Sequence, residues 1–191
     1  MRWTVVALLA LAPGCNCGPS NYYAASTFDN DDDGWTLSPD ATTIRPELSG
    51  AGGDPGGHIC GTDGNMGNTW YFVAPDKFLH DASKAFSKRL TWSLRQDNTF
   101  QQLKGRDVVL QGNGLQMIFN IKATPGTDWK EYAVRLDGSS GWKKDEAPDF
   151  PDAGDDEMKT LLRNVTTLKI RGEYKDGPDH GCLDNVYFGV E

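Results

Sequence analysis

The sequence has little positive charge, few histidines and none of the short motifs that common hydrolases carry. It holds 19 Lys and Arg against 27 Asp and Glu, and three histidines, in 191 residues, for a formal net charge of −8. A nucleic-acid-binding surface needs clustered basic side chains, so no nucleic-acid partner is expected. The motifs G-x-S-x-G and H-E-x-x-H and the glycine-rich phosphate loop are all absent. We therefore expect no enzyme, with a hydrolase that uses two chance-placed carboxylates as the remaining alternative.

Long apolar runs are missing after the N-terminus. The opening "MRWTVVALLALAPGCNC" has one cation at Arg2, an apolar run over Trp3–Ala12 and then small residues. This pattern is typical of a secretory signal, and the run is too short to remain as a membrane-spanning helix. We expect an exported protein.

The residues before Cys15 look like a relaxed bacterial lipobox. This interpretation predicts cleavage before Cys15 and a lipid on its thiol, with residues 1–15 as the signal and 16–27 as a tether. The protein would then be a bacterial outer-membrane or cell-surface lipoprotein that contacts the membrane through its lipid alone. Ordinary cleavage and secretion, with Cys15 as a plain cysteine, is the alternative.

Cysteine is scarce, and export places it in an oxidising compartment. If Cys15 is lipidated, Cys17, Cys60 and Cys182 are left. A bridge between Cys60 and Cys182 would close a long loop and contribute on the order of 4 kcal/mol in the loop-entropy model. Cys17 then has no partner. A zinc site is not favoured, because no Cys-x2-Cys pair stands outside the signal region and the histidines are scattered.

Alternating side chains predict an all-β fold. In "KRLTWSLRQ", Leu90, Trp92 and Leu94 share one face, which makes Trp92 a core residue. "DVVLQGNGLQMIFNI" has two apolar runs around Gly112-Asn113-Gly114, the strongest hairpin signal in the chain. Similar short strands recur in "EYAVRLD", "TTLKIRGEY" and "NVYFGV". Such spacing favours an antiparallel sandwich.

One segment has helical periodicity. In "DDEMKTLLRNV", Met158, Leu161, Leu162 and Val165 follow the spacing i, i+3, i+4, i+7, which predicts one short helix near 155–165. The Pro- and Asp-rich stretch before it predicts an exposed loop.

An acidic segment, "FDNDDDGWTLSPD" at 28–40, begins like a calcium loop, with Asp29-x-Asp31-x-Asp33-Gly34. A helix–loop–helix calcium sensor needs a helix on each side, and the flanking residues indicate strand and turn instead. The segment therefore predicts an acidic turn between strands. Simple solvation of such a turn competes with a cation-binding role.

Several motifs in order resemble the laminin IV domain, also called the laminin B domain. They are "NTWYFVAPDKFLHDASKAFSKRLTWSLRQ", "DVVLQGNGLQMIF", "PGTDWKEYAVRLDGSSGW" and "TTLKIRGEYKDGPDHGCLDNVYFG". The order and spacing match from about Phe28 to Val190, so residues 28–191 form the expected domain. The chain is similar to a free-standing bacterial form, because the Cys-rich epidermal-growth-factor-like modules that flank this domain in laminins are missing from the sequence.

The resemblance implies a jelly-roll sandwich of the galactose-binding-like kind. It also implies a structural Ca2+ where the first loop meets the last strand, with Asp29, Asp54 and Asp184 at the matching positions. Carboxylates and carbonyls from distant loops would have to converge there, because Ca2+ takes six to eight oxygen ligands.

A ligand-binding face is expected from aromatic and charged residues. Trp129 and Trp142 flank Gly-rich turns and are candidates for exposed sugar-stacking rings. Arg95, Arg171 and Tyr174 lie on predicted strands and would complete the site; an internal ion pair or a solvated sheet face is the alternative.

We therefore expect a secreted or surface-anchored, non-catalytic module that binds carbohydrate or another extracellular or cell-surface polymer. The alternative is a structural or adhesion module that contacts proteins and has no small-molecule site.

Overall fold

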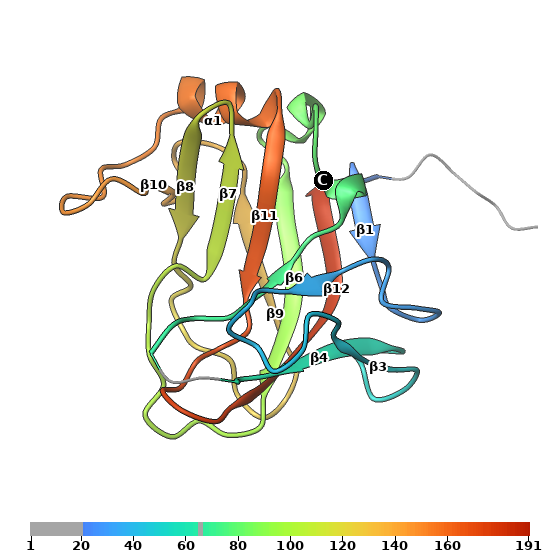
Figure 1. Cartoon of the computed structure of the whole chain (residues 1–191). Helices are drawn as coiled ribbons and strands as arrows, with labels where there is room; N and C mark the ends of the chain where they lie inside the picture. Colours follow the sequence, from blue (N-terminus) through green and yellow to red (C-terminus); the bar gives the residue numbers. More distant parts are fainter. Residues whose placement is uncertain (1–20, 65–66) are drawn as a thin grey trace, which may run out of the picture.

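Alternating apolar and polar side chains build two antiparallel sheets that pack face to face. The computed structural model describes residues 21–64 and 67–191 (Figure 1). In strand β6 (Arg89–Gln96), Leu90, Trp92 and Leu94 are fully buried against the other sheet, as expected for one face of a sandwich. The prediction of an all-β, antiparallel sandwich is confirmed.

Sheet A is the six-stranded sheet that lies behind in Figure 1. Its strand order is β3-β4-β12-β6-β9, and β1 also pairs with β12. Its strands are β1 (Ala24–Ser26), β3 (Glu47–Ser49), β4 (His58–Thr62), β6, β9 (Lys130–Arg135) and β12 (His180–Val190).

Sheet B is the six-stranded sheet that lies in front, and its strand order is β10-β8-β7-β11-β5-β2. Its strands are β2 (Thr36–Leu37), β5 (Tyr71–Val73), β7 (Val108–Gly112), β8 (Leu115–Phe119), β10 (Lys143–Lys144) and β11 (Val165–Arg171). The β7–β8 hairpin turns at Asn113 and Gly114, whose φ angles are 49° and 75°, as the Asn-Gly signal predicted.

Strand β12 connects all the parts of sheet A. It pairs with β6 along one edge, while its first half pairs with β4 and its second half with β1 along the other. The last strand therefore holds segments from the start and the middle of the chain.

The expected helix is present as α1 (Asp155–Leu162), which covers one end of the sandwich beside the β7–β8 turn (Figure 1). Met158, Leu161 and Leu162 are fully buried, and the Glu157 side chain accepts a hydrogen bond from the Gly154 backbone at the helix start. Two 3₁₀ turns, η1 (Asp76–Phe78) and η2 (Ser83–Ala85), lie between β5 and β6.

Only some of the predictions made for the N-terminal residues fall within the described part of the chain. The signal, Cys15 and Cys17 lie outside the described residues. The tether expected over 16–27 ends earlier than predicted, because Ala24–Ser26 pair with Val186–Phe188 as strand β1. In the part of the chain that the structure describes, no helix has the length and apolar character needed to cross a membrane.

Within the acidic segment 28–40, residues 28–35 form the turn that leads from β1 to β2, as predicted. Its aspartates bond the turn itself: Asp31 accepts from the Asp33 amide, and Asp32 accepts from the Gly34 amide. The Asp33 carboxylate also contacts Ser26 at 2.7 Å. Asp33 also forms an ion pair with Lys77, so the acidic turn is bonded both to itself and to its neighbours.

A buried tryptophan fixes one end of the sandwich. The ring of Trp70 lies so close to Gly61 and Gly172 that an added Cβ would come within 2.8 Å and 2.0 Å of ring atoms. The Trp70 Nε1–H donates to Asp179 at 3.2 Å. Glycine is required at both positions because the ring occupies the space of a side chain.

We predict that Gly172→Ala destabilises the fold by about 1–3 kcal/mol or more, because the core must shift to admit the methyl group. Gly50→Ala is the matched control: its Cβ would meet nothing within 4 Å, so its effect should stay within about 0.5 kcal/mol. Urea unfolding followed by circular dichroism measures both. Equal stability of the two variants would contradict this account of the Trp70 packing.

Candidate functional site

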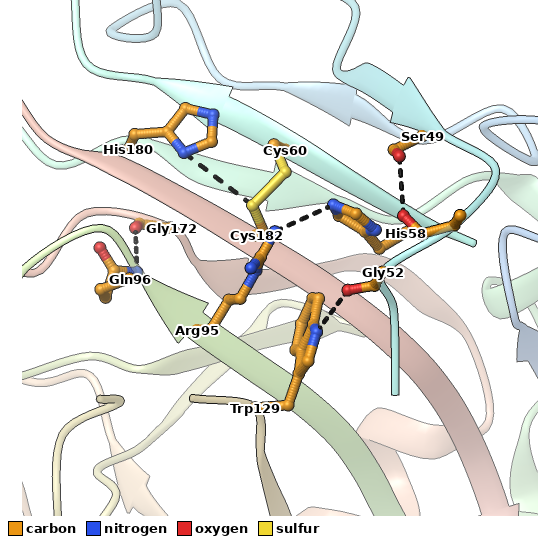
Figure 2. The surroundings of a disulfide bond; sticks show 11 residues. Ser49, Gly52, His58, Cys60, Arg95, Gln96, Trp129, Gly172, His180 and Cys182 are labelled. Atoms are coloured by element: carbon orange, nitrogen blue, oxygen red, sulfur yellow. Dashed lines mark hydrogen bonds between the residues drawn. A yellow bond between two sulfur atoms is a disulfide. The ribbon is translucent and has the colours of Figure 1, made fainter. Parts of the chain in front are cut away.

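The disulfide predicted between Cys60 and Cys182 is present and lies on the outer face of sheet A (Figure 2). The two cysteines are directly paired across β4 and β12. Their chain neighbours Ile59 and Leu183 are fully buried on the opposite face, which places the sulfurs on the outside.

Trp129 lies beside this disulfide and holds a loop instead of offering a free ring. Its Nε1–H donates to the Gly52 carbonyl at 2.8 Å, and its ring packs edge-on against His58 at 5.4 Å (Figure 2). The Arg95 guanidinium lies 5.0 Å from the ring centre. Of the five predicted ligand-binding residues, Trp129 and Arg95 are the pair that the structure brings together on sheet A.

The surroundings of His58 favour the neutral form of its imidazole ring. Burial first, and then the positive charge of Arg95, lowers the pKa of His58. A neutral imidazole can accept from Arg95, whose Nη2 lies 3.3 Å from His58 Nε2. The cluster is therefore a packed connection between β4, β6 and the loop before β9.

The three predicted calcium ligands converge at the loop 50–57 that Trp129 holds. Asp29 accepts from the Gly57 amide at 3.1 Å, and Asp184 accepts from the Asp54 amide at 2.6 Å. Asp54 accepts from the Ser93 hydroxyl at 2.8 Å. The first loop and the last strand thus meet here, as the resemblance implied.

A bulge in β12 aims Asp184 at this place. The pairing of β12 with β6 shifts register between Asp184 and Tyr187, and Asn185 has a φ of 50°. The Asn185 side chain donates to the Asp54 carbonyl. Burial, followed by the charges of Asp54 and Asp29, raises the pKa of Asp184 to about 6.

Oxygen atoms crowd around two glycines of the same loop. A Cβ on Gly53 would lie 2.6 Å from an Asp184 oxygen, and a Cβ on Gly56 would lie 2.2 Å from an Asp29 oxygen. The all-oxygen donor set fits Ca2+, but each aspartate also accepts hydrogen bonds, and the three are not among the compact groups described next. A calcium ion at this loop therefore stays a prediction.

Two other groups, in the described ranges 21–64 and 67–191, have ligand atoms within 4.8 Å of one another. One is His58 with the two bridged cysteines, whose sulfurs are committed to the disulfide. The other is Asp40, Asp63 and Glu173, which no sequence motif places together.

The other three predicted ligand-binding residues are buried, which corrects the proposed exposed face. Trp142 is fully buried, and its Nε1–H donates to the Arg135 carbonyl at 2.8 Å. Arg171 and Tyr174 are 3 % and 1 % exposed, with the guanidinium 5.0 Å from the tyrosine ring. Arg171 also lies 3.9 Å from the buried Asp107, so the alternative of an internal ion pair describes it.

The outer face of sheet B carries a polar row that was not predicted from the sequence. Thr167, Gln111 and Gln116 are paired in sequence across β11, β7 and β8, and the Asp145 amide donates to the Gln116 carbonyl. Their side chains are joined, since Gln111 donates to Gln116 and Gln116 donates to the Asp145 carboxylate. Arg106 extends the row by an ion pair with Asp145 at 2.8 Å.

Two surface pockets lie at the ends of the next row. Lys169, Ile118 and Lys143 belong to one cross-strand row through β11, β7, β8 and β10. A pocket of about 430 Å³ is lined by Ile118, Lys143 and Phe150 at one end, and a pocket of about 310 Å³ by Lys169 and Tyr71 at the other. Gln111 and Gln116 stand symmetrically about the Asn-Gly turn, a signal that could have located this face from sequence.

Comparison with known proteins shows both the fold class and the family of this chain. The fold is the jelly-roll sandwich of carbohydrate-binding modules and of laminin domains. The family 30 carbohydrate-binding module of a cellulosomal cellulase of Clostridium thermocellum superposes with a TM-score of 0.56 at 13% identity, over 88% of this chain and 98% of that one. The L4b domain of human laminin alpha-2 gives a TM-score of 0.56 at 11% identity, over 65% and 71%.

The chain belongs to the laminin B (domain IV) family, because the family model matches residues 71–190, more than half of the chain. It is 32% identical to laminin subunit gamma-1 of Danio rerio over 174 residues, which is 88% of this chain. The chain spans about a tenth (10%) of the length of that relative.

We predict that removal of the disulfide by Cys60→Ala with Cys182→Ala lowers the free energy of unfolding by about 4–5 kcal/mol, because the bridge closes a loop of 122 residues. Guanidinium unfolding measures the loss. The control is dithiothreitol, which should destabilise the wild-type protein and leave the double variant unchanged. A wild-type protein insensitive to the reductant would show that the bridge contributes little.

We also predict that a chelator lowers the melting temperature and that added Ca2+ restores it, because the ion would relieve the repulsion among Asp29, Asp54 and Asp184. Asp184→Asn should reduce this calcium-dependent shift. Differential scanning calorimetry with and without chelator is the measurement. A melting temperature that does not respond to chelator argues against calcium at this loop.

Proposed function

We propose that this chain is a non-catalytic module that binds extracellular carbohydrate polymer across the outer face of sheet B. The observation that carries the proposal is the joined polar row of Gln111, Gln116 and Asp145, which runs beside two pockets with aromatic residues at their rims. Sugars are recognised by polar groups held in place beside an aromatic face.

The aromatic residues at the two ends carry cations close to their rings. The Arg106 guanidinium lies 5.9 Å from the Phe150 ring centre, and the Lys169 ammonium lies 5.9 Å from the Tyr71 ring centre. Each end therefore offers an apolar surface and strong hydrogen-bond donors together. Because the two pockets stand at opposite ends of one row, an extended chain fits the face better than a single sugar does.

Rigidity supports a binding role over a catalytic one. The polar side chains of this face are tied to one another, and the strands below them are packed by Leu110, Met117 and Leu168, all fully buried. A preformed surface loses little entropy on binding. The sequence also carries none of the common nucleophile, zinc or phosphate-loop motifs.

We propose further that the protein is exported, with the disulfide and a calcium ion as stabilising elements on sheet A, remote from the ligand. The N-terminal signal pattern supports export and a lipid at Cys15. Contact with a matrix protein is the second candidate. It is favoured by the exposed apolar side chains of Ile44 and Phe100, which are 72% and 66% exposed.

We predict that Phe150→Ala and Tyr71→Ala each weaken polysaccharide binding by about tenfold, because each removes an aromatic surface at one end of the face. Glycan arrays followed by affinity electrophoresis would measure binding. Trp129→Ala is the control: Trp129 packs against His58 and Arg95 on the outer face of sheet A, so this variant should bind polysaccharide as the wild type does.

Binding that is lost in the Trp129 variant but kept in the other two would contradict the placement on sheet B. If no glycan binds and a cell-surface protein is captured without competition from sugars, the adhesion alternative replaces the proposal.

A further inference from the structure

Three carboxylates from distant parts of the chain meet at the end of the sandwich that Trp70 fixes. Asp40 follows β2, Asp63 follows β4, and Glu173 follows β11. Their ligand oxygens lie within 4.8 Å of one another. The group therefore joins sheet B, through Asp40 and Glu173, to sheet A, through Asp63.

The backbone fixes this arrangement. Ala41 and Asp63 form an isolated β-bridge, and the Gly64 amide donates to the Asp40 carbonyl at 3.0 Å. The Glu173 carboxylate accepts from the Trp70 amide at 2.9 Å. The carboxylates are thus held together by the fold and do not meet by chance on a flexible surface.

One oxygen of the group has no hydrogen-bond partner. Asp40 Oδ2 is shielded from solvent and is not bonded to any group in the described residues. Leaving a buried carboxylate oxygen without a partner costs free energy, which a bound cation would remove. Burial first, and then the charges of Asp63 and Asp179, raises the pKa of Glu173 to about 7, and the charge of Arg171 opposes this shift.

We propose that Asp40, Asp63 and Glu173 bind a calcium ion, separate from the ion predicted at Asp29, Asp54 and Asp184. Three carboxylates with no sulfur or imidazole suit a hard cation. Two ligands on opposite sides of Ca2+ are separated by about 4.6–5.2 Å, twice the usual Ca–O distance. Ligand oxygens within 4.8 Å of one another therefore meet the size requirement without rearrangement.

Solvent can deliver the ion. The pocket of about 310 Å³ between Lys169 and Tyr71 is also lined by Asp40, Ser38 and Thr69. Water in this pocket would supply the coordination positions that the protein leaves open. The ion would join the two sheets, whereas the disulfide joins two strands of sheet A.

The test is isothermal titration of the full chain with CaCl2 at about pH 8, where Glu173 is ionised. Asp40→Asn keeps the shape of the side chain and removes its charge, and Asp184→Asn is the matched variant at the other loop. We expect Asp40→Asn to lower the affinity of one calcium site by at least about tenfold, while Asp184→Asn leaves that site intact.

A second measurement separates a cation site from a structural role. Without calcium, Asp40→Asn should melt at a higher temperature than the wild type, because it removes like-charge repulsion. With saturating calcium the order should reverse. Glu173→Gln provides the same comparison if Asp40→Asn does not fold. A wild type that binds no calcium, or a titration that neither variant changes, overturns the proposal. Sugar binding at the Phe150 pocket, which none of the three carboxylates lines, stays a separate test.

Discussion

The pairing of β12 with three other strands is the constraint on which the rest of the structure depends. Its register with β6 places Leu183 and Phe188 in the core, and its register with β4 places Cys182 opposite Cys60. A slip of one residue would reverse every side chain and separate the two sulfurs. The bulge after Asp184 then turns the strand toward the first loop, so one strand sets the core, the disulfide and the acidic loop together.

Negative charge is concentrated where the loops close the sandwich. Asp184 and Glu173 both have raised pKa values, to about 6 and about 7, because each is buried and faces other carboxylates. Carboxylates that served only to keep the protein soluble would be exposed to water, whereas those of Asp184 and Glu173 are buried. Divalent cations are abundant outside cells, and in a chain with a net charge of −8 these two acidic groups are the places where we propose that such cations bind.

The sequence alone was sufficient to predict the structure where a local pattern determines it. Leu90, Trp92 and Leu94 defined a core face, and the Asn113-Gly114 pair defined a hairpin, because both signals are local. It was misleading where burial depended on distant segments. Trp142 follows a Gly-rich turn, yet it is covered and bonded to the Arg135 carbonyl, and Arg171 is covered by the loop that carries Gly105. Asp40 and Glu173 come together only through the topology of the two sheets. No short stretch of the sequence could therefore show that they are neighbours.

The uneven burial of tryptophan gives this protein an internal optical reporter. In the described part of the chain, Trp35, Trp70, Trp92 and Trp142 are sealed in the core, and Trp129 alone among the tryptophans retains contact with solvent. A collisional quencher such as iodide would reach this indole and spare the other four. Because its Nε1–H is bonded to Gly52, the quenched part of the emission would report on the contact between Trp129 and loop 50–57.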